Sequence, residues 1–159
     1  MRNAPCARLA GFTLLELMIV MAIIGVCISL AVVNLKPSKK QVLKQEVRRL
    51  TLVLETARDK ALFSGRPVRW QFIEGEIVFF TLDLKGEWAF SNNKLKNYSP
   101  GDGVSLTEIT IDGYIADEET VAVFMPHGFS SAFSVRLVLG DHTGETLGDK
   151  MGRIKMNMR

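Results

Sequence analysis

The sequence predicts an α+β fold in which a long N-terminal helix precedes antiparallel sheets. Three observations support this class. Residues 12–35 form an apolar run with one charged side chain, residues 43–61 repeat apolar side chains at alternating spacings of four and three, and apolar and polar residues alternate from Pro67 onward. The first two patterns are helical and the third is typical of strands, so the chain changes from helix to sheet near Gly65.

The apolar run from Phe12 to Leu35 has the length of a membrane-spanning helix. A helix of these 24 residues extends for roughly 36 Å, and a bilayer core is about 30 Å thick. Its one charged side chain is Glu16, and a carboxylate inside a membrane costs roughly 2.5–3.5 kcal/mol, so a partner is expected. Cleavage after Gly11 would place the new α-amino group of Phe12 about one helical turn from Glu16 and would supply that partner.

The segment Gly11-Phe12-Thr13-Leu14-Leu15-Glu16, which follows a short basic leader, resembles the leader-peptide site of type IV pilins and type II secretion pseudopilins. The resemblance implies that a prepilin peptidase cleaves after Gly11 and methylates the amine of Phe12. It also implies that Glu16 aligns subunits in a filament by pairing with the Phe12 amine of a neighbour. The alternative is a plain single-span anchor, in which the Glu16 carboxylate reaches the membrane interface.

Charge is distributed unevenly along the chain. Residues 36–64 hold eight Lys and Arg against three Asp and Glu, a net charge of +5, and residues 65–159 hold ten against thirteen, a net charge of −3. The positive-inside rule would therefore place the C-terminal part in the cytoplasm. The resemblance implies the opposite orientation in the bacterial inner membrane, with a cytoplasmic N-terminus and a periplasmic C-terminal domain. The cysteines, Cys6 and Cys27, precede that domain, so it can contain no disulfide.

Residues 36–64 are predicted to form an amphipathic stalk helix. Ser38 is a candidate N-cap after Pro37, and Gly65 follows the predicted end of the helix. The seam packs either on the chain's own sheet or, as a coiled coil, on another subunit; about three heptads are short for an independent coiled coil, which favours the sheet. The seam consists of Leu43, Val47, Leu50, Leu54, Ala57 and Ala61.

Residues 65–159 are predicted to form seven or eight short strands in antiparallel sheets that pack partly on the stalk. A hairpin loop is expected at residues 140–144, because Gly140 and Gly144 bracket polar residues. The candidate strands are residues 68–73, 76–82, 87–90, 104–111, 120–125, 133–139, 145–147 and 153–158.

Residues 121–130, with their Pro126-His127-Gly128 turn, and the later Gly152-Arg153-Ile154 are similar to the GspH/FimT group of minor pseudopilins. The resemblance implies a type IV pilin-like fold, with a long N-terminal helix followed by an antiparallel β-sandwich. It implies four segments: a leader (1–11), a transmembrane and filament-core helix (12–35), the stalk (36–64) and a periplasmic domain (65–159).

The function implied by this resemblance is that of a minor pseudopilin of a type II protein secretion system. Such a subunit assembles at or near the tip of the periplasmic pseudopilus, which helps to export folded proteins across the outer membrane. The implied partners are other minor and major pseudopilins, the prepilin peptidase, the inner-membrane assembly platform and the secreted cargo.

The alternative function is that of a FimT-like minor pilin of a type IV pilus, involved in pilus assembly or DNA uptake. Lys150, Arg153, Lys155 and Arg159 would then offer a basic patch to phosphates. The net charge of −3 and an expected absence of clustered exposed aromatic side chains argue against a nucleic-acid partner.

Neither catalysis nor a cofactor is predicted. The residues Ser130, His127 and Asp141 are of the types found in a catalytic triad, but no nucleophile elbow surrounds any serine. The acidic run 117–119 is either a cation site or a solvated turn, and the turn is the commoner use of such a run. No metal site is therefore expected.

Overall fold

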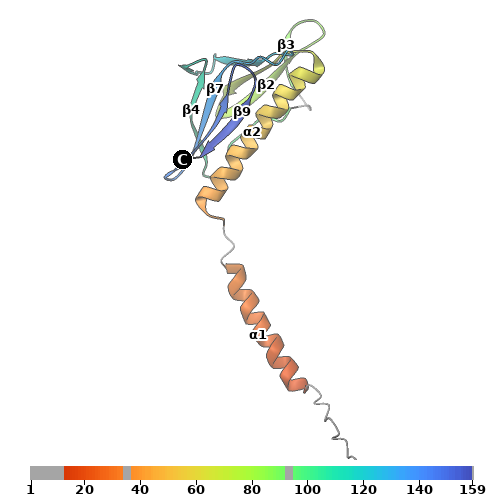
Figure 1. Cartoon of the computed structure of the whole chain (residues 1–159), viewed down its shortest axis with the longest axis vertical. Coiled ribbons are helices and arrows are strands. Elements are labelled where there is room, and N and C mark those ends of the chain that lie inside the picture. The colour runs from red at the N-terminus through yellow and green to blue at the C-terminus, as the bar shows by residue number, and fades with distance from the viewer. Residues whose placement is uncertain (1–12, 34–36, 92–94, 159) are drawn as a thin grey trace, which may run out of the picture. The chain divides into compact units, whose positions relative to one another are not determined.

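The computed structural model describes residues 13–33, 37–91 and 95–158 (Figure 1). The chain divides into two compact units, Met1–Pro37 and Ser38–Arg159. The first contains helix α1 (Leu14–Val33), and the second contains helix α2 (Lys39–Ser64) followed by the strands.

Helix α1 is apolar around its whole circumference. Thr13 caps its first turn, because the Glu16 N–H lies 3.2 Å from Thr13 Oγ1 and 3.1 Å from the Thr13 carbonyl oxygen. Its described large apolar side chains, from Leu14 to Ile28, are exposed. In the described part of the chain, no helix is long and apolar enough to cross a membrane.

Helix α2 begins and ends where the sequence predicts. The Gln41 N–H donates to Ser38 Oγ (3.2 Å) and the Ser38 N–H donates to Gln41 Oε1 (3.0 Å), which is a reciprocal capping box. Gly65 ends the helix in the left-handed conformation, with φ of 65°. The six residues of the predicted seam are all fully buried: Leu43, Val47, Leu50, Leu54, Ala57 and Ala61.

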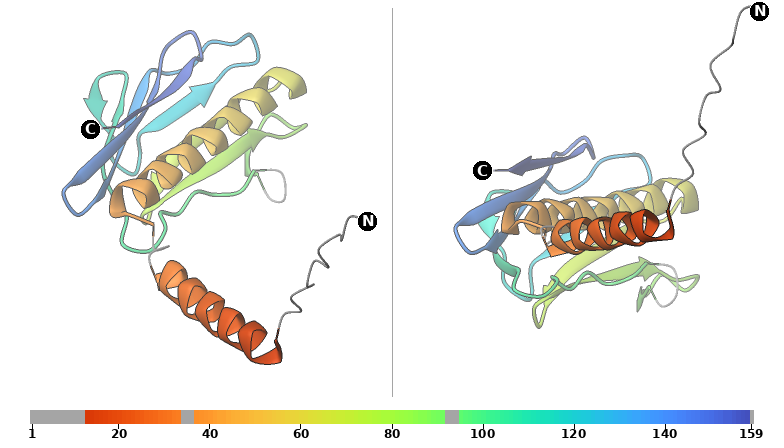
Figure 2. Two further views of the ribbon diagram at one scale, coloured as in Figure 1. Left: turned by 60° about the horizontal axis from the view of Figure 1, so that its bottom comes forward. Right: turned by 90° about the horizontal axis from the view of Figure 1, so that it is seen from below.

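The strands form two antiparallel sheets, as the predicted fold class requires, and Figure 2 shows α2 lying along them. The order in the first sheet is β3 (Trp88–Phe90), β2 (Glu76–Leu82), β1 (Val68–Ile73) and β6 (Val121–Phe124). The order in the second sheet is β5 (Tyr114–Ile115), β4 (Ser105–Ile111), β7 (Phe133–Leu139), β8 (His142–Gly148) and β9 (Ile154–Met158).

Aromatic side chains join the two sheets in the core. The ring of Phe133, from the second sheet, packs edge to face on Trp70 (5.2 Å between centroids) and on Phe124 (6.0 Å), both from the first sheet. The seam of α2 packs mainly on β8, β9 and β7 of the second sheet and also reaches β1 and β6. The seam is therefore used inside the chain, as the sheet-packing alternative predicts.

Strand β8 approaches α2 closely because small residues face the helix. Gly144 is buried, and a Cβ placed on it would lie 2.5 Å from Val47 Cγ2. Two residues along the strand, Thr146 Oγ1 lies 3.1 Å from Thr51 Oγ1 of the helix, and both side chains are buried. This hydrogen bond satisfies the polar groups of the contact.

Two sequence predictions about the hairpins are wrong. Leu139 pairs with His142, so Gly140 and Asp141 form a two-residue turn in place of the predicted five-residue loop, and β8 begins three residues before the predicted strand. The sequence prediction also omits strand β5, although it follows an Asp112-Gly113 pair whose φ values of 50° and 92° suit a tight hairpin.

Candidate assembly surfaces

The predicted processing site lies at the start of the chain. Gly11 and Phe12 fall outside the described residues. Glu16 lies in the first turn of α1, where its carboxylate has a favourable interaction with the helix dipole. Because residues 13–33 contain no Lys or Arg, a cationic partner for Glu16 must come from outside this segment. The roles assigned to these three residues stay predictions.

A polar cluster around Glu46 fastens the N-terminal half of α2 to the loop before β4. The Glu46 carboxylate accepts hydrogen bonds from Arg49 Nη2 (2.7 Å), the Tyr98 hydroxyl (3.2 Å) and the Gly101 N–H (3.3 Å). The Arg49 guanidinium also lies 4.6 Å from the centroid of the Tyr98 ring and donates to the Ser99 carbonyl oxygen. The cluster thus joins residues that are about fifty positions apart in the sequence.

The cluster shifts the pKa values of its members. Partial burial acts to raise the pKa of Glu46, but the hydrogen bonds from Arg49, Gly101 and Tyr98 outweigh it and hold the pKa below the usual value. Burial, assisted by the negative charge of Glu46, raises the pKa of the Tyr98 hydroxyl well above its ordinary range. Glu46 is therefore ionised and Tyr98 neutral near pH 7, which is the combination that these hydrogen bonds require.

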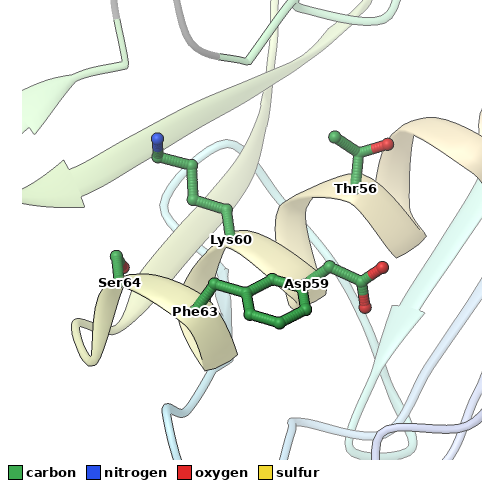
Figure 3. Close-up of a pocket in the computed structure, with 5 residues that line it drawn as sticks. All are labelled: Thr56, Asp59, Lys60, Phe63 and Ser64. Atoms are coloured by element: carbon green, nitrogen blue, oxygen red, sulfur yellow. The ribbon is translucent and has the colours of Figure 1, made fainter.

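The outer face of α2 carries a shallow hollow near its C-terminal end (Figure 3). All its lining residues belong to one helix: Thr56, Asp59, Lys60, Phe63 and Ser64. The Phe63 side chain is 89% exposed. Because no second element closes the hollow, it lacks the enclosure and the convergent polar groups of a small-molecule site.

The residues considered for catalysis are not brought together. The Ser130 hydroxyl donates to the neighbouring Ser131 carbonyl oxygen (2.6 Å), and the His127 ring packs edge to face on Phe129 at 5.2 Å. Within residues 13–33, 37–91 and 95–158, no hydrogen bond joins any two of Ser130, His127 and Asp141.

The acidic run 117–119 forms a turn that uses its own carboxylate. Asp117 accepts hydrogen bonds from the Glu119 N–H (3.2 Å) and the Thr120 N–H (2.8 Å). Among the described residues, no group of three or more His, Cys, Asp or Glu side chains is arranged to hold a metal ion. Residues 117–119 thus form a turn that hydrogen bonds to the Asp117 carboxylate stabilise.

The basic C-terminal patch is partly neutralised. The Arg153 Nε donates to the Asp149 carboxylate (2.8 Å), so its charge is already paired within its own hairpin. Arg159 falls outside the described residues. Among the described members of the predicted patch, Arg153 is thus the cation whose contribution to phosphate binding is reduced.

An exposed aromatic cluster overturns one expectation from the sequence. The guanidinium of Arg69, on β1, lies 4.5 Å from the ring centroid of Phe80 and 4.9 Å from that of Trp88. The Phe90 ring packs on Phe80 at 4.6 Å and is 61% exposed. The alternation of β1 places Arg69 opposite the core face, but sequence alone does not show that β2 and β3 bring aromatic rings beside it.

Two family models match separate parts of the chain. The prokaryotic N-terminal methylation motif matches residues 7–32. The family described as type II transport protein GspH matches residues 46–153, which is about two thirds of the chain. A comparison with curated protein sequences gives no match.

Solved structures show the same fold at low sequence identity. The minor pseudopilin EpsH from the type II secretion system of Vibrio cholerae is 13% identical, with a TM-score of 0.59 over 73% of this chain and 96% of that chain. The solution structure of Escherichia coli GspH is 15% identical, with a TM-score of 0.59 over 79% and 94%. The type IV minor pilin FimU of Pseudomonas aeruginosa is 13% identical, with a TM-score of 0.54 over 72% and 87%.

Proposed function

Because the chain belongs to the family of GspH type II transport proteins, we propose that it is a minor pseudopilin of a type II protein secretion system. The observation that carries the proposal is the presence, in one chain, of the N-terminal methylation motif at residues 7–32 and the GspH domain at residues 46–153. In this proposal the protein is a structural subunit and not an enzyme.

The proposal divides the chain by function. Residues 1–11 are the leader, which the prepilin peptidase removes before it methylates Phe12. Residues 12–35 anchor the subunit in the inner membrane and later enter the filament core. Residues 36–64 form the stalk, and residues 65–159 form the periplasmic domain, with the leader on the cytoplasmic side.

Assembly depends in this proposal on a charge pair between subunits. Glu16 of one subunit pairs with the methylated amine of Phe12 in its neighbour, which removes the cost of an isolated carboxylate among apolar helices. The exposed apolar surface of α1 supports this role, because that surface needs lipid or sister helices around it. The subunit sits at or near the tip of the pseudopilus, where its β-domain contacts other pseudopilins, the inner-membrane assembly platform or exported cargo.

Co-purification of the full-length protein from native membranes tests this function, with mass spectrometry of its N-terminus and of its partners. The expected result is an N-methylated Phe12 together with other pseudopilins and a secretion ATPase. An intact Met1 would contradict the proposed processing and would indicate a plain anchor.

The alternative is a type IV minor pilin that acts in pilus assembly or DNA uptake, and the structural similarity to FimU favours it. The same purification separates the two functions, because this alternative requires type IV pilus subunits in place of secretion proteins. A salt-dependent affinity for DNA that is lost when Lys150 and Lys155 are replaced would also support it.

A further inference from the structure

Strand β3 lies at an edge of the first sheet, and among the described residues no backbone hydrogen bond uses the outward groups of Trp88 and Phe90. The Asp83 N–H donates to the Glu87 carbonyl oxygen (2.8 Å), and the Ser91 N–H donates to the Phe79 carbonyl oxygen (3.0 Å). Antiparallel strands alternate in the direction of their hydrogen bonds, so the N–H and C=O groups of Trp88 and Phe90 point away from β2. These groups are the ladder positions that an added strand would use.

Strand β3 is only three residues long, which limits strand addition, but it contains no Lys, Pro or bulge. Lys, Pro and bulges commonly protect exposed edges, and β3 with its preceding residue reads Glu87-Trp88-Ala89-Phe90. Trp88 is 37% exposed and Phe90 is 61% exposed. An extended segment beside β3 would cover both side chains while pairing with their backbone groups.

Arg69 brings a positive charge to the aromatic rings of this edge, and Glu87 at the start of the strand brings a negative one. Register places Arg69, Phe80 and Phe90 in one row across the sheet, because Arg69 pairs with Phe80 and Phe80 with Phe90. The Arg69 guanidinium contacts the aromatic rings of Phe80 and Trp88. Its Nε is buried without a hydrogen-bond partner, and among the described residues Arg69 makes no ion pair.

An Arg held against two aromatic rings is positioned to bind a carboxylate. The contacts with the rings restrict the guanidinium, so less conformational entropy is lost when a carboxylate binds to it. Side chains on one face of a strand recur every second residue, so an added strand can present an acidic side chain to Arg69 and apolar side chains to Trp88 and Phe90.

We propose that β3 is a strand-addition site that binds an extended segment of a partner protein, with an acidic side chain of that segment paired to Arg69. Main-chain hydrogen bonds to Trp88 and Phe90 supply affinity, and the Arg69 pair together with the aromatic surface supplies selectivity. The inference stands on the sheet edge and its side chains and does not depend on the proposed function.

Synthetic peptides and the full-length protein in detergent micelles test the site. The probe is a short blocked peptide of alternating Thr and Val with one central Glu, and its matched control carries Lys at that position. We expect the Glu peptide to bind roughly tenfold more tightly than the Lys peptide. The Glu side chain is attracted by the positive charge of Arg69, whereas the Lys side chain is repelled by it. Amide NMR signals of Trp88 and Phe90 should shift with binding.

Three controls distinguish binding at this site from non-specific binding. N-methylation of the peptide backbone at alternate residues should abolish binding, because it removes the N–H groups that would donate hydrogen bonds to the backbone of β3. Arg69→Gln should bring the two peptides to equal affinity, whereas Arg69→Lys should keep a reduced preference for Glu. The amides of Tyr114 and Ile115, in the exposed edge strand β5 of the other sheet, should not shift.

Several results would overturn the proposal. These are undetectable binding of the Glu peptide, equal affinity for the Glu and Lys peptides in the unmodified protein, and indifference to N-methylation. A single-stranded oligonucleotide that shifts the Trp88 and Phe90 amides more strongly than the Glu peptide would assign the aromatic cluster to nucleic acid. Unchanged thermal unfolding of both Arg69 variants confirms that the comparisons are made on folded protein.

Discussion

Replacement of Gly144 by Ala should destabilise the domain by forcing α2 away from β8. The added methyl carbon would lie 2.5 Å from Val47 Cγ2, 2.9 Å from Met158 Sδ and 3.6 Å from Leu43 Cγ. Ordinary carbon contacts are about 3.5–4.0 Å, so the first neighbour must move by roughly 1 Å or more. Val47 is fully buried, and a β-branched side chain in a helix strongly prefers one χ1 rotamer, so overpacking of this kind costs about 1–3 kcal/mol.

Truncation of the colliding side chain should relieve the cost. Val47→Ala alone leaves a small cavity and costs about 1–3 kcal/mol, but in the double variant the methyl group added at position 144 occupies part of that space. The losses of stability in the single variants Gly144→Ala and Val47→Ala should therefore sum to more than the loss in the double variant, by about 1–2 kcal/mol.

Urea unfolding of the full-length protein in detergent, followed by the tryptophan fluorescence to which buried Trp70 contributes, measures these free energies. A loss of 1 kcal/mol corresponds to a melting temperature lower by about 3–6 °C in a domain of this size. Thr143→Ala, one residue away and on the opposite face of β8, is the matched control and should change stability by less than about 0.5 kcal/mol. A close approach of β8 to α2 would be refuted as the cause if Gly144→Ala were as stable as the unmodified protein, or if the double variant lost the full sum of the two single losses.

Three further predictions concern charge and processing. Glu46→Gln should lower stability at pH 7 by about 1–3 kcal/mol by weakening charge-assisted hydrogen bonds, and calorimetry should show a smaller loss on acidification. Because its hydrogen bonds lower the pKa of Glu46, the ionised carboxylate stabilises the domain above the ordinary pKa of 4.5, and this stabilisation is lost as the pH falls below it. Glu16→Ala should leave insertion and cleavage intact but reduce co-purification with other pseudopilins; undiminished recovery would refute the charge pair. Gly11→Ala should slow leader removal, seen as retained precursor on gels, and normal processing would count against the assigned cleavage site.

Local patterns in the sequence predict the elements that local physics determines. The seam from Leu43 to Ala61 can be identified because helical periodicity is set by the backbone, and Ser38 and Gly65 can be identified because capping uses neighbouring groups. The prediction of Gly144 as a loop residue is wrong because a glycine needed for close packing looks the same in sequence as a glycine needed for a turn. Its role depends on Val47, which is nearly a hundred positions away.

The same distinction, between features formed by neighbouring residues and features formed by distant segments, applies to the functional surfaces. The processing motif is contiguous, so the roles proposed for Gly11, Phe12 and Glu16 can be predicted from sequence alone. The Glu46 cluster and the Arg69 surface join residues from distant segments, and no periodicity signals which strands become neighbours. The strand order that makes β3 an edge is a property of the assembled sheets.

The burial of the α2 seam constrains how this subunit can recognise others. Each apolar residue of that seam packs inside the chain, so α2 has no second heptad stripe with which to form a coiled coil. Apart from Glu16, the described side chains of α1 form an exposed, mainly apolar surface, and such a surface gives association without much selectivity. Selectivity among similar subunits must then come from directional groups on the sheet domain. Of those described, the open edge of β3 combines unpaired ladder positions, exposed aromatic rings and an Arg without an ion-pair partner, and for this reason the test of partner choice belongs there.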